Sequence, residues 1–164
     1  MTELSVAVRT GIGYDSHRFA PGGPMRLGGI DISADVHCAG HSDGDAICHA
    51  VTDALLGAVG LGDIGEMFPD TDIANKDKDS ILMLQAAHVR LRTVGWRVGN
   101  IDITVITQQP KIGPQRAAMR ERLSASLGIT MEQVSVKGKT NEGMGWIGRG
   151  EGLAVMAVAT VVRA

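Results

Sequence analysis

Apolar residues that alternate with polar ones, or that run continuously, predict four β-strands. In residues 98–108, Ile101, Ile103 and Val105 alternate with polar neighbours, as expected for a strand with one buried face. Residues 153–162 are apolar at both odd and even positions, which is typical of a strand buried on both sides. The predicted strands are 5–13, 98–108, 134–139 and 153–162, and residues 25–32 form a short strand or hairpin arm.

Three segments with apolar residues at helical spacing predict α-helices. In the first, Ile47, Val51 and Leu55 share one side, and Ser42 followed by Asp45 fits a capping box at the helix start. The second helix begins at Asp79 or Ser80 and runs to about Val94, and the third spans about 114–127 and ends at Gly128.

These elements predict an α+β fold, with a mixed or antiparallel four-stranded sheet and helices packed on one face. The helices can cover that face, whereas the apolar last strand indicates that the opposite face is buried too. In a chain of 164 residues the second cover must come from another subunit, so we expect a homo-oligomer. The length suits one domain, 1–164, without repeats or linkers.

Composition and charge narrow the class of protein. A net charge of −2 argues against a general nucleic-acid binder. No apolar stretch is long enough to cross a membrane, and the first residues lack the pattern of a signal peptide. The two cysteines, Cys38 and Cys48, form no CxxC pair, which favours a reducing compartment. We therefore expect a cytoplasmic protein that binds neither nucleic acid nor a membrane.

Two groups of acids and histidines are candidates for metal binding. Asp15 and His17 lie two residues apart, so in extended backbone they share one side and can supply two of three zinc ligands. Asp45, His49 and Asp53 lie four residues apart, on a helix face opposite the apolar stripe. The simpler alternatives are a hydrogen-bonded Asp–His pair and a solvated histidine beside two acids, and each group alone leaves them open.

Other polar residues gather in loops without a regular period. His41 and Ser42 stand before a helix N-terminus, where they can add donors for an anion. The acids of 62–72 suit turns, hydroxyl groups, an amino group or metals better than a phosphate pocket. Lys111 follows a strand at a position where ligands often bind, with a solvated lysine as the alternative. Glu142 lies in a glycine-rich segment and can bind a hard cation, but the segment does not follow the Walker pattern.

Four motifs occur in order along the chain: GIGYDSHRF, AGHSDGDAICHAVTDALLGA, GLGDIGEMFPDTD and GRGEGLAV. Together they resemble 2-C-methyl-D-erythritol 2,4-cyclodiphosphate synthases, enzymes of the non-mevalonate isoprenoid pathway. The resemblance extends from about Val8 to Val162, and the D-x-H pair with HSDGD-x-x-x-H is highly specific. It implies a homotrimer whose sheets face the threefold axis and whose active sites lie between neighbouring subunits.

The resemblance also implies a phosphorus–oxygen lyase. This family converts 4-diphosphocytidyl-2-C-methyl-D-erythritol 2-phosphate into 2-C-methyl-D-erythritol 2,4-cyclodiphosphate and CMP, by attack of the 2-phosphate on the β-phosphate. Asp15, His17 and His49 would bind one Zn²⁺ per subunit and leave a fourth position open. Mg²⁺ or Mn²⁺ on Glu142 would bridge the substrate diphosphate.

Further roles follow from the matched positions. Asp45 and Asp53 are candidates to orient His49 from behind. His41 and Thr140 match the catalytic positions that align and stabilise the transferring phosphoryl group. The substrate-binding positions are Ser42 at the 2-phosphate; Asp63, Ile64 and Gly65 at the erythritol; Phe68, Pro69, Asp70, Thr71 and Asp72 in the next loop; Thr107, Gln108, Gln109, Pro110, Lys111, Ile112 and Gly113 at the cytidine; and Lys139 and Asn141 beside the phosphates.

A few positions depart from the pattern of the family. The usual run K-A-T-T-T-E appears here as K-G-K-T-N-E, with Lys139 and Asn141 at threonine positions, and Trp146 stands where phenylalanine is common. Trp146 and Arg149 match residues near the trimer axis, where some members hold an isoprenoid diphosphate.

Two other functions are compatible with the same residues. A zinc-dependent phosphohydrolase would use the same three ligands and leave room for an attacking water. A non-catalytic trimer would only bind a metal ion or an isoprenoid diphosphate. The products distinguish the three functions: CMP with a cyclic diphosphate, linear products, or no turnover.

Overall fold

A five-stranded mixed sheet forms the centre of the molecule. The computed structural model describes residues 7–32 and 34–164. The strand order is β4-β1-β7-β5-β6, where only β5 and β6 run parallel. The strands are β1 (Val8–Pro21), β4 (Val36–Cys38), β5 (Trp96–Ile106), β6 (Val134–Lys139) and β7 (Gly152–Arg163), and β2 (Met25–Leu27) pairs with β3 (Ile30–Ile32) in a separate ribbon.

The prediction of an α+β fold is confirmed, but the predicted count of four strands in the sheet is wrong. The fifth strand, β4, pairs with the end of β1. It is only three residues long and contains His37, so it shows no hydrophobic period. The first strand also continues beyond the predicted end at residue 13, because the side chains that face inward there are Asp15 and His17 rather than apolar ones.

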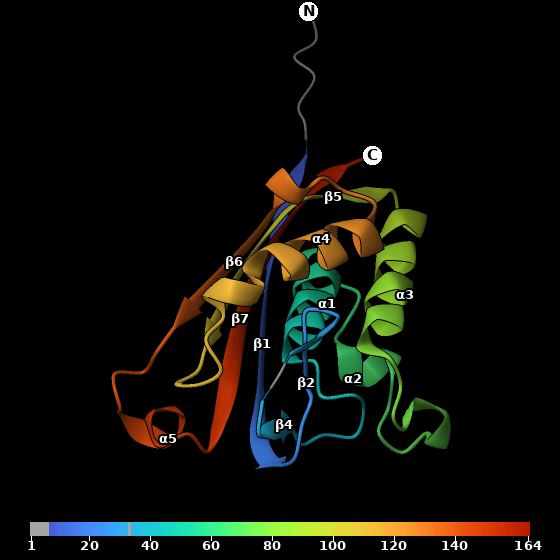
Figure 1. Cartoon of the computed structure of the whole chain (residues 1–164). Helices are drawn as coiled ribbons and strands as arrows, with labels where there is room; N and C mark the ends of the chain where they lie inside the picture. The colour runs from blue at the N-terminus through green and yellow to red at the C-terminus, as the bar shows by residue number, and fades with distance from the viewer. Residues whose placement is uncertain (1–6, 33) are drawn as a thin grey trace, which may run out of the picture.

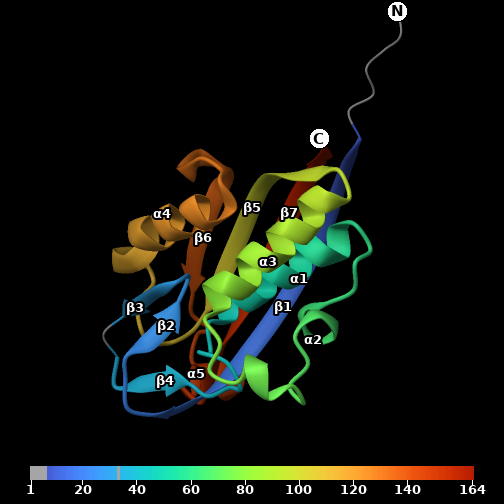
Figure 2. The same cartoon turned by 90° about the vertical axis from the view of Figure 1, so that its right-hand side faces the viewer.

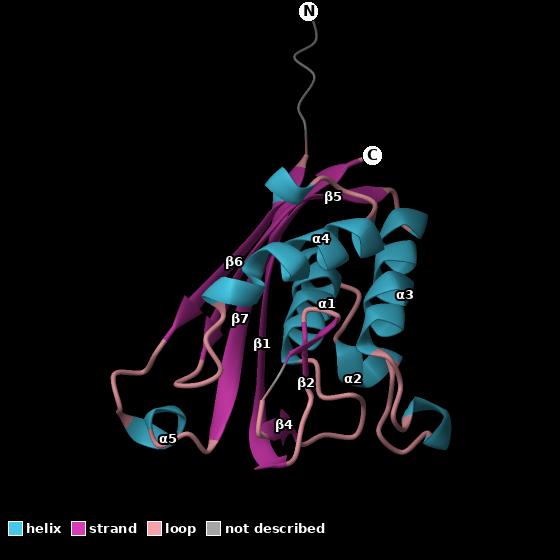
Figure 3. Ribbon diagram, in the orientation of Figure 1, coloured by secondary structure: helices cyan, strands magenta, loops and turns pink. Residues whose placement is uncertain are grey.

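Three long helices cover one face of this sheet (Figures 1 and 3). Figure 2 shows two of them crossing the sheet in front of β1, β5 and β7, while the third lies beside β6. They are α1 (Ala46–Ala58), α3 (Ser80–Thr93) and α4 (Arg116–Leu127), and the shorter helices are α2 (Ile64–Met67), η1 (Ile73–Asn75), η2 (Gly113–Gln115), η3 (Met131–Gln133) and α5 (Gly145–Gly148).

The predicted ends of α3 and α4 agree with the structure, because both depend on local backbone chemistry. Asp79 caps α3, and its side chain accepts a hydrogen bond from the N–H of Ile81. Gly128 ends α4 in the left-handed conformation, with φ of 60°. The capping box predicted for α1 does not form, since Asp45 is itself the N-cap and accepts from the N–H of Cys48.

Two glycines of β1 let α1 approach the sheet closely. A methyl group on Gly11 would lie 2.6 Å from the Ala58 nitrogen, and one on Gly13 would lie 2.7 Å from the Ala50 carbonyl carbon. No real side chain tolerates such distances, so the strand and the helix meet backbone to backbone. Because β1 carries Asp15 and α1 carries His49, this contact sets the spacing of the site described below.

The other face of the sheet is apolar and exposed in the single chain. Ile12 pairs with Val158, and Tyr14 pairs with Met156, across β1 and β7. These side chains are between 39% and 65% exposed. Exposed apolar patches of this kind mark interfaces. Within one chain the last strand is therefore buried mainly on its helix side, and burial of its other face stays a prediction. No helix in the described residues is long and apolar enough to span a bilayer.

Candidate metal centre and active site

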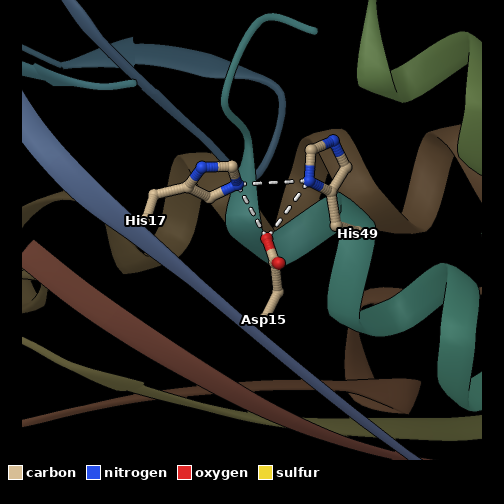
Figure 4. A group of neighbouring side chains, drawn as sticks. All are labelled: Asp15, His17 and His49. Atoms are coloured by element: carbon tan, nitrogen blue, oxygen red, sulfur yellow. Dashed lines mark hydrogen bonds and ion pairs between the residues drawn. The ribbon is translucent and has the colours of Figure 1, made fainter. Parts of the chain in front are cut away.

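Three side chains from two elements converge at one point beside the sheet (Figure 4). Asp15 and His17 project from the same side of β1, and His49 comes from the first turn of α1. His17 Nε2 lies 2.9 Å from Asp15 Oδ2, and His49 Nδ1 lies 3.1 Å from the same oxygen. The two imidazole nitrogens are 3.4 Å apart. The prediction that His49 turns away from the apolar core of its own helix is borne out, because its side chain faces Asp15 and His17 of β1.

These separations fit a metal ion. Bonds of about 2.0–2.1 Å in a tetrahedral zinc site place neighbouring ligand atoms about 3.3 Å apart. The side chains of His17 and His49 are each 12% exposed and that of Asp15 is 26% exposed, so the point they share is accessible from one side. Two imidazoles and a carboxylate with an open side are the ligand set of a catalytic zinc site. Asp15, His17 and His49 could therefore hold a metal ion.

Both imidazoles are held through their second nitrogen. His17 Nδ1 lies 2.7 Å from the carbonyl oxygen of Ala39. Because a carbonyl only accepts, Nδ1 carries the proton and Nε2 keeps a lone pair for the site. His49 Nε2 lies 2.8 Å from Ser80 Oγ and 3.0 Å from Ser42 Oγ. Such contacts fix the orientation of metal-binding histidines.

The electrostatics of the site favour positive charge at its centre. Burial by itself would raise the pKa of Asp15 and lower the pKa of His17. When His17 is protonated, however, its hydrogen bond and its charge attraction to Asp15 outweigh the effect of burial. The pKa of Asp15 therefore lies below its usual range and that of His17 above it.

The two acids predicted to orient His49, Asp45 and Asp53, accept hydrogen bonds from backbone N–H groups instead. Asp45 is fully buried and accepts from the N–H groups of Gly28 at 2.9 Å and Gly29 at 2.6 Å, besides capping α1. Asp53 accepts from the N–H of Ile64 at 2.7 Å. Among the described residues neither carboxylate bonds to His49, so this prediction is wrong. The physical reason is that unpaired backbone N–H groups in turns and at helix starts compete for nearby carboxylates.

A pocket of about 250 Å³ opens in front of the convergent side chains. It is lined by the predicted residues His41, Ser42, Ile64, Gly65, Phe68 and Asp70, and by Asn75 and Met83, which the sequence analysis missed. Asn75 lies in η1 and Met83 in α3, so only the folding of residues 62–83 brings them here.

The other predicted substrate-binding residues of 63–72 lie around this pocket rather than in its wall. Asp63 caps α2 through the N–H of Glu66 at 2.8 Å, and Asp72 caps η1 through the N–H of Ala74 at 3.0 Å. Pro69 accepts a hydrogen bond from the Asn75 side chain at 3.0 Å, and Thr71 is exposed. The turn chemistry of these acids is therefore real, and their contacts to a substrate stay a prediction.

A second pocket, of about 280 Å³, collects most of the predicted cytidine residues. Its charged wall consists of Lys111, Arg116 and Lys139, and no carboxylate of the described residues lines it. Arg116 is the first residue of α4 and belongs to no motif, so the sequence offered no signal for it. The pocket is lined by Thr107, Pro110, Lys111, Ile112, Gly113, Pro114, Arg116, Gly138, Lys139 and Thr140.

The remaining predicted residues lie close to this second pocket or near α5. Gln108 accepts from the N–H of Asn141 at 2.9 Å, and Gln108 and Gln109 line a neighbouring pocket with Phe19. Glu142 accepts from the Thr140 hydroxyl at 3.2 Å.

Two further predicted residues belong to α5 and its C-terminal end: Trp146 lies within the helix and Arg149 is its C-cap. Trp146 borders a small pocket beside His17. Arg149 donates to Glu151 at 2.6 Å.

Within one chain the predicted catalytic pair is divided. His41 lines the pocket with the candidate metal ligands, and Thr140 lines the cationic pocket. The two pockets share no residue of the described chain. A single chain therefore holds the two predicted catalytic residues in separate pockets.

Comparison with known proteins decides the family. The model of the YgbB family matches residues 8–162, which is nearly the whole chain. The chain belongs to the YgbB family. A relative from Gemmatimonas aurantiaca is named 2-C-methyl-D-erythritol 2,4-cyclodiphosphate synthase; it is 75% identical over 159 residues, which cover 97% of this chain and 96% of the relative.

Solved structures of the YgbB fold agree with the architecture. "IspF (Plasmodium falciparum) CDP complex" has a TM-score of 0.85 and 36% identity, and the match covers 95% of this chain and 96% of that one. The bifunctional IspDF of Campylobacter jejuni has a TM-score of 0.94 and 39% identity. That match covers 98% of this chain but only 43% of the larger IspDF protein. Membership in the family confirms the resemblance inferred from the four motifs, and with it the enzyme class.

Proposed function

We propose that this YgbB-family chain converts 4-diphosphocytidyl-2-C-methyl-D-erythritol 2-phosphate into 2-C-methyl-D-erythritol 2,4-cyclodiphosphate and CMP. The observation that carries the proposal is the convergence of Asp15, His17 and His49 at the pocket of His41 and Ser42. The name and 75% identity of the Gemmatimonas aurantiaca relative support it. The CDP complex of the Plasmodium falciparum structure supports a cytidine nucleotide as part of the ligand.

The reaction needs no nucleophile from the protein. An oxygen of the 2-phosphate forms a bond to the β-phosphorus, the bond from that phosphorus to the α–β bridging oxygen breaks, and CMP leaves with the electron pair. The two thiols of the chain are poor nucleophiles, because burial raises the pKa of Cys38 to about 12 and that of Cys48 well above its usual value. The task of the protein is to align two phosphates and to offset their charge.

The two pockets, which we interpret as half-sites of one active site, divide this task. Asp15, His17 and His49 would hold Zn²⁺, which when bound supplies Lewis-acid polarisation of a phosphate oxygen. His41 and Ser42 place hydrogen-bond donors in the same pocket. Lys111, Arg116 and Lys139 provide the positive charge for the nucleotide diphosphate in the second pocket.

Glu142 stands at the edge of the second half-site. Its carboxylate is exposed and offers oxygen ligands for Mg²⁺ or Mn²⁺.

The complete active site requires neighbouring subunits, and we propose the homotrimer. Two observations support association: the exposed apolar pairs Ile12–Val158 and Tyr14–Met156, and the separation of the two half-sites within one chain. Sheets that face a threefold axis would bury the apolar face and bring the cationic pocket of one subunit to the metal ligands of the next. An isoprenoid diphosphate near Trp146 and Arg149 stays a prediction.

Phosphorus NMR on the purified protein with Zn²⁺, Mg²⁺ and the cytidyl substrate tests the proposal. The proposed lyase yields CMP and a cyclic diphosphate in equal amounts. A zinc-dependent phosphohydrolase would yield linear phosphates, and a binding protein would leave the substrate unchanged. Either of the last two results overturns the proposed function.

A further inference from the structure

We propose that Ser80 and Asp43 are positioning residues for His49, and that together they direct the lone pair of His49 Nδ1 toward Asp15 and His17. The inference builds on the proposed metal role of these three side chains. Ser80 is fully buried and its hydroxyl lies 2.8 Å from His49 Nε2. The same hydroxyl donates to Asp43 Oδ1 in a short hydrogen bond. His49, Ser80 and Asp43 thus form one chain of hydrogen bonds.

The direction of each proton follows from the donors and acceptors available. An ionised Asp43 carboxylate only accepts, so the single hydroxyl proton of Ser80 goes to Asp43. Ser80 Oγ then faces His49 with a lone pair, and Nε2 must supply the proton between them. A neutral imidazole with its proton on Nε2 has a free lone pair on Nδ1. That is the atom which lies 3.1 Å from Asp15 Oδ2 and 3.4 Å from His17 Nε2.

Two backbone hydrogen bonds and one ion pair hold the Asp43 carboxylate in place. Its second oxygen accepts from the N–H of Ser80 at 3.0 Å, and its first oxygen accepts from the N–H of Asp45 at 3.1 Å. The Arg26 guanidinium in β2 lies 3.8 Å from Asp43 and donates to Asp31 at 2.9 Å. Hydrogen bonds therefore connect the start of α3 and the loop before α1 to the His49 ring, and the ion pair between Arg26 and Asp43 adds the β2–β3 ribbon.

Helix capping alone does not account for this arrangement. Asp79 already caps α3 through the N–H of Ile81 at 2.8 Å. A cap from Asp43 to the N–H of Ser80 would also leave the Ser80 hydroxyl free to point anywhere, yet it lies between the carboxylate and the imidazole. The geometry is that of a ligand histidine oriented by groups behind it, for which loss of the partner typically weakens metal affinity 10–100-fold.

Asp43→Asn is the sharper of two test variants. The asparagine amide can donate to Ser80 Oγ, which then donates to His49 Nε2 and moves the imidazole proton to Nδ1, where it blocks the lone pair. Ser80→Ala removes the hydroxyl but leaves Ser42 Oγ 3.0 Å from Nε2 as a partial substitute. We expect zinc affinity, measured by competition with a chelating dye, to fall about 100-fold in Asp43→Asn and about 10-fold in Ser80→Ala.

Asp79→Ala is the matched control, because it removes a cap at the same helix start without touching His49. It should lower the melting temperature and leave zinc affinity unchanged. Long-range ¹H–¹⁵N spectra should place the His49 proton on Nε2 in the parent and on Nδ1 in Asp43→Asn.

Three results overturn the inference. They are zinc affinity within twofold of the parent in both variants, an equal loss of affinity in Asp79→Ala, or an unchanged His49 proton position in Asp43→Asn. If the parent binds zinc but forms no cyclic product, the proposed function fails, and the order of affinities still tests the positioning role.

Discussion

Replacing Gly13 with alanine tests whether the backbone contact between β1 and α1 sets the geometry of the metal site. The new methyl group would lie 2.7 Å from the Ala50 carbonyl carbon and closer still to the Ala50 carbonyl oxygen, whereas ordinary contacts begin at 3.4 Å, so strand and helix must separate by more than about 0.7 Å. Ala50 directly follows His49, and Asp15 lies two residues beyond Gly13. The separation therefore moves His49 away from Asp15.

The expected effect has two parts. Overpacking of a tight contact destabilises a protein by about 1–3 kcal/mol, which in a chain of this size lowers the melting temperature by roughly 2–12 °C. Functional sites tolerate displacements of about 0.5 Å, and a separation of more than about 0.7 Å exceeds that limit. We expect zinc affinity to fall at least tenfold, and turnover to fall about 100-fold.

Gly57→Ala provides the matched control. Gly57 lies in the same helix on its exposed side, with no atom within 4 Å of the added methyl group. Alanine should stabilise the helix by about 0.5–1 kcal/mol and leave zinc affinity unchanged. Differential scanning fluorimetry and chelator competition, at one fixed protein concentration, measure both variants. A Gly13→Ala protein that melts lower but binds zinc like the parent would refute the link between this contact and the site.

Three further changes test other parts of the molecule. His49→Ala should abolish zinc binding and turnover while the oligomer stays intact by light scattering; zinc retained at parental affinity would contradict its role as a ligand. Glu142→Gln should shift the magnesium titration of activity to higher concentrations by about tenfold, and an unchanged titration would count against this carboxylate. Met156→Lys places a charge on the exposed apolar face and should yield a monomer without turnover, whereas Leu82→Lys, at an exposed position of α3, should leave the oligomer unchanged. Oligomers of equal mass in both lysine variants would rule out the sheet face as the interface.

Local chemistry allowed much of the fold to be predicted. The 3.6-residue period and the caps located α3 and α4, the two-residue period located β5, and continuous apolar residues located β7, since each signal depends on neighbours along the chain. The same logic placed Asp15 and His17 on one side of a strand. It failed at β4, which is too short to show a period, and at the end of β1, where the polar residues Asp15 and His17 face inward.

By itself the sequence determined the residue types, their order and the local spacing, and these already carried the candidate metal ligands and the family. Only the tertiary structure decided which polar groups meet. In the structure, Asp45 and Asp53 accept hydrogen bonds from backbone N–H groups. Ser80 and Asp43 form a hydrogen-bond chain with His49. Arg116 lies in the wall of the cationic pocket. The physical reason is that a hydrogen bond forms with the donor nearest in space. That donor is fixed by how closely helices and strands pack, here by two glycines of β1.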